Sequence, residues 1–297
     1  MIFVRTSALL QAGDLRSPQK FPKPEAPAAN AGRPGTAPAV YLINLARRPD
    51  RLRAMERMAG RLGLGLTRIE AVDVRGAPRR EIGRYFSRTG PLGEISPGDK
   101  GCVLSHRLFW QALADSGEDY AAVLEDDAVL TASAARFLAD TSWIPPGVDL
   151  IKLEHYGPAR QGILVSDFAA VAPGFQLARL HSRHTGTGGY ILSRRGALKL
   201  LALDRFDLPV DHLLFNPNTS PLFADLAPRQ LIPAVLRQRD FVGLKSDIEV
   251  FRKEFRKFNW RYAKRELLRL AYELRLLPAQ LAAALSGRAK FIAIRTE

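Results

Sequence analysis

The chain has 297 residues, of which 46% are hydrophobic and 25% are charged, a composition typical of globular proteins. A single cysteine, Cys102, excludes an internal disulfide, and no apolar run approaches the roughly 18 residues that span a bilayer. The formal net charge of +14 favours anionic partners: phosphorylated substrates, nucleic acid or an acidic membrane surface. The first residues lack the apolar core and cleavage site of a secretory signal, so we expect a cytoplasmic protein.

Residues 1–38 are rich in Ala, Pro and Gly and have no periodicity, which predicts a disordered or loosely packed extension. An apolar run at 39–45 predicts a buried strand, Pro49 suits the first turn of a helix, and residues 67–72 predict a second strand. Strand, helix and strand in this order form a βαβ unit, which implies a parallel sheet with a right-handed crossover. The predicted fold class is therefore α/β.

Farther along the chain, the pattern of apolar residues predicts a helix over 101–115 and strands at 120–125, 149–154 and 190–193. In residues 245–297, Phe and Leu recur at helical spacing with Arg and Lys interleaved, which predicts one or two basic amphipathic helices. Such a tail either lies on an anionic membrane surface or packs its apolar stripe on the preceding domain, which we place at 39–244.

Three adjacent carboxylates, Glu125, Asp126 and Asp127, follow directly on the apolar run at 120–124. Ligand sites of open α/β sheets lie just past the carboxyl ends of strands. Adjacent carboxylates repel one another, and a divalent cation relieves that repulsion; oxygen ligands suit Mg²⁺ or Mn²⁺. The alternative is a strand that runs out into an acidic surface turn, and this stretch alone does not decide between the two.

Five segments follow one another at a characteristic spacing: residues 43–51 (Ile-Asn-Leu-Ala-Arg-Arg-Pro-Asp-Arg), 70–73 (Glu-Ala-Val-Asp), 98–106 (Gly-Asp-Lys-Gly-Cys-Val-Leu-Ser-His), 124–127 (Leu-Glu-Asp-Asp), and 186–193 (Gly-Thr-Gly-Gly-Tyr-Ile-Leu-Ser) with 209–212 (Pro-Val-Asp-His). Together they resemble glycosyltransferase family 25, which includes lipooligosaccharide β-galactosyltransferases and collagen galactosyltransferases. The resemblance covers about residues 40 to 240. It implies a GT-A fold, with a Rossmann-type nucleotide-binding sheet flanked by helices, a nucleotide-sugar donor (commonly UDP-galactose) and dependence on Mn²⁺.

The exits of the first two predicted strands supply donor-binding candidates. Asn44, Arg47 and Arg48 stand where a nucleotide would bind, and an arginine there can meet phosphate or ribose oxygens. Asp73 can accept hydrogen bonds from the base or the ribose. The alternatives are that the arginines solvate an amphipathic helix and that Asp73 only forms a turn.

Further donor-binding candidates come from the third and fifth segments. By the resemblance, Lys100 would neutralise the diphosphate, and Ser105 and His106 would bind sugar hydroxyls; a packed helix histidine is the alternative for His106. Gly188 and Gly189 would let the backbone form a wall of the sugar pocket, unless they make a flexible turn before the next strand.

The metal ligands are predicted from the acidic triplet. Alternate residues of an extended segment share a side, so we predict Asp127 as a direct ligand, Glu125 as a ribose or water-bridged metal contact, and Asp126 pointing elsewhere. His212 would either complete the metal shell or pack in the interior.

Inversion at the sugar needs a base on the acceptor side, opposite the departing UDP, which removes a proton from the attacking hydroxyl. Asp211 is the first candidate, with a helix N-cap as the alternative role, and Glu154 is the second.

The predicted function is thus a metal-dependent, inverting glycosyltransferase that moves galactose or a related hexose from UDP to a cell-envelope glycan or glycolipid such as lipooligosaccharide. It would act in the cytoplasm, with the tail as a peripheral contact to the inner face of the membrane. One rival is a nucleotidyltransferase with the same metal–diphosphate geometry. Another is a basic nucleic-acid-binding protein, but the acids cluster where a phosphate-tracking groove should be basic.

Overall fold

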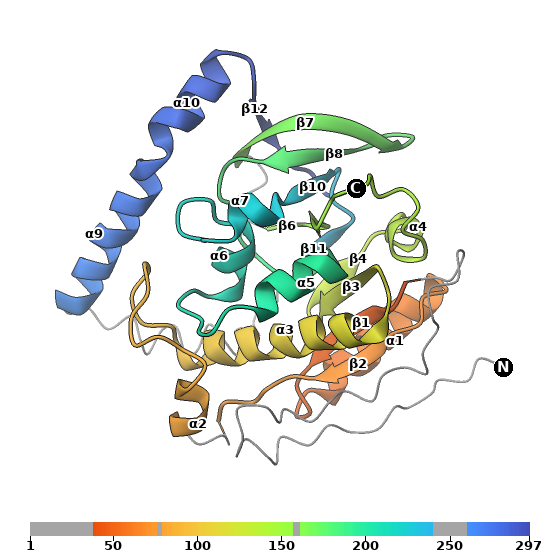
Figure 1. Ribbon diagram of the computed structural model, residues 1–297. Helices are drawn as coiled ribbons and strands as arrows, with labels where there is room; N and C mark the ends of the chain where they lie inside the picture. The colour runs from red at the N-terminus through yellow and green to blue at the C-terminus, as the bar shows by residue number, and fades with distance from the viewer. Residues whose placement is uncertain (1–37, 76–78, 157–160, 240–259) are drawn as a thin grey trace.

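The computed structural model describes residues 38–75, 79–156, 161–239 and 260–297 (Figure 1). The predicted N-terminal extension, apart from residue 38, lies outside these ranges. No helix in the described part of the chain has the length and hydropathy needed to cross a membrane.

A nine-stranded mixed sheet forms the centre of the molecule (Figure 1). In spatial order its strands are β12 (Lys290–Ala293), β7 (Gly162–Ala172), β8 (Phe175–Leu180), β10 (Arg229–Ile232), β5 (Leu150–Lys152), β9 (Gly189–Ser193), β3 (Tyr120–Glu125), β1 (Val40–Asn44) and β2 (Thr67–Glu70). Strand β1 pairs in parallel with both β2 and β3. The carboxyl ends of these three strands therefore meet at one edge of the sheet. The parallel pairing of β1 with β2 is the one that the βαβ pattern predicted.

Both faces of the sheet are covered, because alternate residues of the buried strands feed two apolar cores. Tyr41 and Ile43 of β1 face the core beneath α3, α5 and α6, while Val40 and Leu42 face the core beneath α1 and α4. The helices are α1 (Pro49–Arg61), α2 (Arg79–Gly83), α3 (Pro97–Ser116), α4 (Ala134–Leu138), α5 (Arg194–Leu201), α6 (Val210–Phe215) and α7 (Phe223–Leu226).

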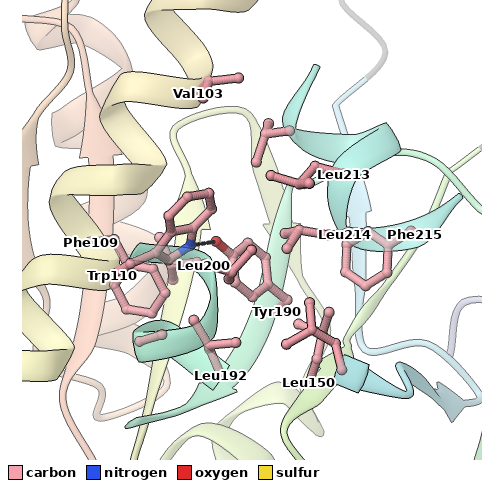
Figure 2. Close-up of a cluster of buried hydrophobic side chains, with 14 of the residues drawn as sticks. Val103, Phe109, Trp110, Leu150, Tyr190, Leu192, Leu200, Leu213, Leu214 and Phe215 are labelled. Atoms are coloured by element: carbon pink, nitrogen blue, oxygen red, sulfur yellow. Dashed lines mark hydrogen bonds between the residues drawn. The ribbon is translucent and has the colours of Figure 1, made fainter. Parts of the chain in front are cut away.

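Helix α3 packs against the strands that carry the candidate site residues. It starts where the Ser96 hydroxyl accepts a hydrogen bond from the Asp99 amide, with Pro97 in the first turn, and it ends at Gly117, which has a φ of 80°. Figure 2 shows its Phe109 and Trp110 packed around Tyr190 of β9, whose hydroxyl accepts a hydrogen bond of 2.9 Å from the Trp110 indole. This contact fixes α3 against the strand that neighbours β3.

A second sheet of three strands contains β4 (Ala128–Leu130), β11 (Leu236–Gln238) and β6 (Glu154–His155). The predicted strand at 149–154 is therefore wrong as one element: it breaks after Lys152, and Glu154 begins a strand of the other sheet. The break is invisible in a local apolar pattern because both halves are buried.

The C-terminal region consists of α9 (Trp260–Arg275), α10 (Leu277–Leu285) and then β12, which pairs antiparallel with β7. A wholly helical tail over 245–297 was thus a wrong expectation, since the last residues join the main sheet and Ile294 is buried in its core. In Figure 1 the two helices form an arm at the side of the molecule. The aromatic part of the predicted stripe, at 251–258, lies outside the described residues.

This arrangement predicts that Ile294→Ala destabilises the whole domain. Ile294 is fully buried, so removing its side chain should lower the free energy of unfolding by about 2–5 kcal/mol. Leu285, near the end of the arm, is 89% exposed, so Leu285→Ala should change the free energy of unfolding by less than about 0.5 kcal/mol. Urea unfolding of both variants checks this, and equal effects would mean that the C-terminal segment does not belong to the core.

Candidate functional site

An open pocket lies where the carboxyl ends of β1, β2 and β3 meet the first turns of α3. Among the predicted site residues, those that line it are Arg47, Asp73, Ser105, His106, Glu125 and Asp127. The position agrees with the general rule for ligand sites of α/β sheets. Asp126, Arg51 and Cys102 also line it.

Asp126 is compensated by neighbouring polar groups. Its carboxylate accepts hydrogen bonds from the Asn44 amide at 2.7 Å and from the Arg51 guanidinium at 3.0 Å. Burial raises the pKa of Asp126, and Arg51 and Asn44 partly counter this. Asn44 is buried and bonded to Asp126 and to the Arg48 carbonyl, so it positions the acidic turn; its predicted contact with a donor remains a prediction.

Glu125 faces the pocket and is held by two donors. One of its oxygens lies 3.1 Å from His106 Nε2 and accepts a 2.5 Å hydrogen bond from the Thr187 hydroxyl. Burial alone would raise the pKa of Glu125, but His106 and Thr187 outweigh it and the pKa is lowered. The other nitrogen of His106, Nδ1, lies 2.9 Å from the Tyr190 hydroxyl, so this buried histidine links Glu125 to the core.

Asp127 is less well compensated, since only the nearby charge of Arg51 opposes its raised pKa. Its Oδ1 atom is buried and has no hydrogen-bond partner among the described residues. Burial, with the charges of Glu125 and Asp126, raises the pKa of Asp127 to about 7. A buried carboxylate oxygen without a donor, next to a second carboxylate at an open pocket, fits a hard divalent cation such as Mn²⁺ or Mg²⁺.

The pocket is also lined by Arg47 and Asp73, which form an ion pair with atoms 2.5 Å apart. The Ser105 hydroxyl accepts a hydrogen bond from the Val72 amide and donates one to the Gly101 carbonyl. Ser105 therefore joins α3 to the exit of β2, and its donor proton is already used inside the protein.

Arg48 and Lys100, like Asn44 and the predicted glycines, are not among the residues that line the pocket. Arg48 pairs with the exposed Asp50 at 2.8 Å, which matches the alternative of an arginine solvating its own helix. Lys100 lies 3.9 Å from Glu94 and stacks over the ring of Phe86. Their predicted roles toward a diphosphate remain predictions.

Glu154 and the glycine segment before β9 lie inside the protein. Glu154 is fully buried and accepts hydrogen bonds from Lys152 Nζ at 2.8 Å and from the Gly188 amide at 2.9 Å. It presents no carboxylate oxygen to an incoming hydroxyl, so the geometry gives no support to Glu154 as the base.

The glycines are needed for internal packing. A Cβ on Gly188 would lie 2.6 Å from Glu154 Oε2, and one on Gly189 would lie 2.1 Å from a methyl of Leu236. The backbone at these glycines is thus closely packed against protein side chains, and their predicted role as a wall of the sugar pocket remains a prediction.

Helix α6 carries Asp211 and His212 outside the pocket lining. Asp211 accepts a hydrogen bond from the His212 amide. Burial lowers the pKa of Lys152, and the nearby Asp211 charge opposes that shift, as it also opposes the lowered pKa of Glu125. His212 Nδ1 lies 2.8 Å from the Asn216 amide. The base role of Asp211 and the metal role of His212 remain predictions.

Sequence reasoning missed Thr187, Tyr190 and Arg51 as parts of the site. Thr187 lies between Gly186 and Gly188, where a hydroxyl side chain among glycines could have been predicted to form a hydrogen bond in the site. Tyr190 appeared as a member of an apolar strand, and only the fold shows its hydroxyl beside His106.

Comparison with known proteins identifies the family. A family model described as glycosyltransferase family 25 (LPS biosynthesis protein) matches residues 37–214, more than half of the chain. The chain belongs to glycosyltransferase family 25. The resemblance predicted from the five segments is confirmed.

Several relatives are similar over part of their length. The lacto-N-neotetraose biosynthesis glycosyltransferase LgtB of Neisseria gonorrhoeae is 36% identical over 141 residues, 42% of this chain and 48% of that protein. A glycosyltransferase 25 family member of Drosophila pseudoobscura pseudoobscura is 30% identical over 226 residues, 70% of this chain and 33% of that protein. The match thus spans about half or less of these relatives.

A solved structure of a glycosyltransferase involved in glycosylation of the major capsid of PBCV-1 is 10% identical, with a TM-score of 0.35 over 77% of this chain and 100% of that one.

The environment of Asp127 predicts a pH-dependent stability in metal-free buffer. Its folded pKa of about 7 exceeds the unfolded value near 3.9, so the favourable contribution of its protonated form is complete below about pH 4 and is lost as the pH rises through 7. Asp127→Asn should therefore be more stable than the native protein at pH 8, by on the order of 2–4 kcal/mol, and equal to it near pH 4.

Asp126→Asn is the matched control in the same triplet. Burial also raises the pKa of Asp126, but Arg51 and Asn44 partly counter that effect, so the gain in free energy of unfolding of Asp126→Asn at pH 8 should be smaller than the gain of Asp127→Asn. Urea unfolding across the pH range, with a chelator present, gives both values. A native protein as stable as Asp127→Asn at pH 8 would contradict the assignment.

Proposed function

We propose that the protein is a metal-dependent, inverting glycosyltransferase of the GT-A type, which transfers galactose or a related hexose from UDP to a cell-envelope glycan such as lipooligosaccharide. The observation that carries this is the uncompensated Asp127 oxygen beside Glu125, in a pocket at the carboxyl edge of β1, β2 and β3. Family membership, and the names of relatives such as LgtB, support the sugar donor and the glycan acceptor.

Asp127 and Glu125 would hold the cation, which supplies charge stabilisation for the leaving diphosphate when it is bound. Hydrogen bonds from His106 and Thr187 keep Glu125 ionised and oriented toward the pocket. The wall containing Arg47 and Asp73 would receive the nucleotide: a guanidinium can meet phosphate or ribose oxygens, and a carboxylate can accept from a ribose hydroxyl or a base.

The acceptor side is assigned to α6. The acceptor hydroxyl attacks the anomeric carbon, UDP departs from the opposite face, and Asp211 takes the hydroxyl proton. One Asp211 oxygen already accepts the His212 amide, which fixes the carboxylate and leaves its second oxygen to act as the base. A positioned base of this kind contributes typically about 10²–10⁴ in rate.

Two variants should separate donor binding from transfer. Asp127→Asn removes the oxygen that lacks a donor and should abolish Mn²⁺-dependent binding of UDP-sugar. Asp211→Asn should leave donor binding within about twofold of native and lower transfer by about 10²–10⁴. Isothermal titration with Mn²⁺ and UDP-galactose, and turnover with a lipooligosaccharide acceptor, measure the two effects.

Product analysis in the same experiment provides the control. A glycosyltransferase releases UDP, whereas a nucleotidyltransferase releases pyrophosphate. Failure of the native protein to bind any UDP-sugar, with or without a divalent cation, would reject the proposal.

We further propose that the arm formed by α9 and α10 places the enzyme on an anionic membrane surface. Basic residues outnumber acidic ones in α9, and leucines of the arm are exposed instead of packed on the domain. These are Leu267, Leu268, Leu270, Leu274, Leu277, Leu281 and Leu285. Apolar side chains beside cationic ones suit the interface of an anionic bilayer.

Substitution tests the arm better than truncation, since truncation would also remove β12. The double variant Leu270→Glu/Leu274→Glu should bind phosphatidylglycerol-containing vesicles at least about tenfold more weakly than native, because each leucine contributes about 1.5–3 kcal/mol when buried. Leu198→Glu, at an exposed leucine of α5, is the control and should bind as native does. Undiminished sedimentation of the double variant with vesicles would exclude this role.

A further inference from the structure

Three side chains of different chemistry meet at one side of the pocket. Cys102 and His106 are four residues apart on α3 and share its face toward β3, where Glu125 ends the strand. The sulfur, an imidazole nitrogen and a carboxylate oxygen lie within 4.8 Å of one another, and all three residues line the pocket. A cation in the pocket can therefore reach all three.

We propose that Cys102, His106 and Glu125 form a second metal site, selective for thiophilic divalent cations such as Zn²⁺, which shares Glu125 with the Mn²⁺ or Mg²⁺ position at Asp127. Thiolate and imidazole ligands favour Zn²⁺ and Co²⁺ over the hard cations that carboxylates prefer. Three protein ligands at an open pocket leave the fourth tetrahedral position to water or another small ligand.

The observed spacing requires little rearrangement. His106 Nε2 and the Glu125 oxygen are already 3.1 Å apart, close to the separation of two ligands on one tetrahedral ion. Bonds of about 2.3 Å to sulfur and about 2.0–2.1 Å to nitrogen require the sulfur to approach by roughly 1 Å, which rotation of the Cys102 side chain can supply. The metal would replace the direct contact between His106 and Glu125.

The protein also provides an outer partner for the histidine. A ligating imidazole bonds the metal through one nitrogen and donates its other N–H to a nearby oxygen. The Tyr190 hydroxyl is 2.9 Å from Nδ1 and is itself held by the Trp110 indole, so Nε2 can face the metal while Nδ1–H donates to Tyr190. The thiol proton of Cys102 leaves to water on binding, so affinity should fall as the pH is lowered.

Sharing Glu125 makes the two metal positions antagonistic. A thiophilic cation that draws Glu125 toward Cys102 removes it from Asp127 and weakens Mn²⁺-dependent donor binding. The effect on donor binding rests on the proposed glycosyltransferase function, whereas the existence of the site does not.

Cobalt provides the test, because thiolate ligation of Co²⁺ gives a charge-transfer absorption band. The chain has one cysteine, so the band in the full-length protein reports Cys102 alone. We expect a band that saturates at one Co²⁺ per chain, disappears in Cys102→Ser, and appears with at least tenfold weaker affinity in Glu125→Gln. Asp127→Asn, the control, should keep the band while losing Mn²⁺-dependent donor binding.

Absence of the band in the native protein overturns the proposal. So does a band of unchanged affinity in Glu125→Gln, which would mean that Cys102 binds without Glu125. Circular dichroism verifies the fold of each variant, and protection of Cys102 from iodoacetamide by Zn²⁺ tests the site in the native chain. If Zn²⁺ failed to slow the alkylation of Cys102, the site would be contradicted even if donor binding were normal. A normal cobalt band without donor binding would reject only the enzymatic function.

Discussion

Three like charges at the carboxyl end of β3 set the constraint on which the rest of the site depends. Adjacent carboxylates raise one another's pKa, and partial burial strengthens the effect. The fold relieves it unevenly: Asp126 is paired with α1, and Glu125 receives hydrogen bonds from α3 and from the segment before β9. The buried Oδ1 atom of Asp127 has no hydrogen-bond donor among the described residues. Asp127 is therefore the member of the triplet whose ionised form is least stabilised, beside the ionised Glu125 in the pocket.

The segment before β9 is held by a second, fully buried charge pair. Lys152 Nζ contacts both Glu154 and the Gly186 carbonyl, and Glu154 accepts the Gly188 amide, so the pair fixes the turn that presents Thr187 to Glu125. Removing one partner of a buried pair typically costs about 3–5 kcal/mol because the other charge is left unpaired. The site thus depends on an ion pair with no access to substrate.

What could be predicted from the sequence was local. The β1–α1–β2 unit could be predicted from the periodicity of apolar residues. The acidic end of β3 could be predicted from three adjacent acidic residues in the sequence. Strand β12 could not be predicted because it pairs with β7, as in Phe291 opposite Leu164, across more than a hundred residues. Only the fold shows that Glu154 and Leu236 pack against the glycines before β9, because both residues are distant from them in the sequence.

The charge distribution bears on the order in which a cation and a diphosphate would bind. The net charge of +14 attracts anions to the protein, but the field at Glu125 and Asp127 has the opposite sign. Two like unit charges 4 Å apart repel by about 4 kcal/mol at the effective dielectric constant near a protein surface. A diphosphate would meet this repulsion unless a cation were already present.

Because the pKa of Asp127 is about 7, a cation entering at neutral pH also displaces a proton from part of the molecules. In the proposed enzyme the net positive charge of the protein increases the rate at which the donor associates. The acidic triplet makes stable binding of the donor depend on the cation.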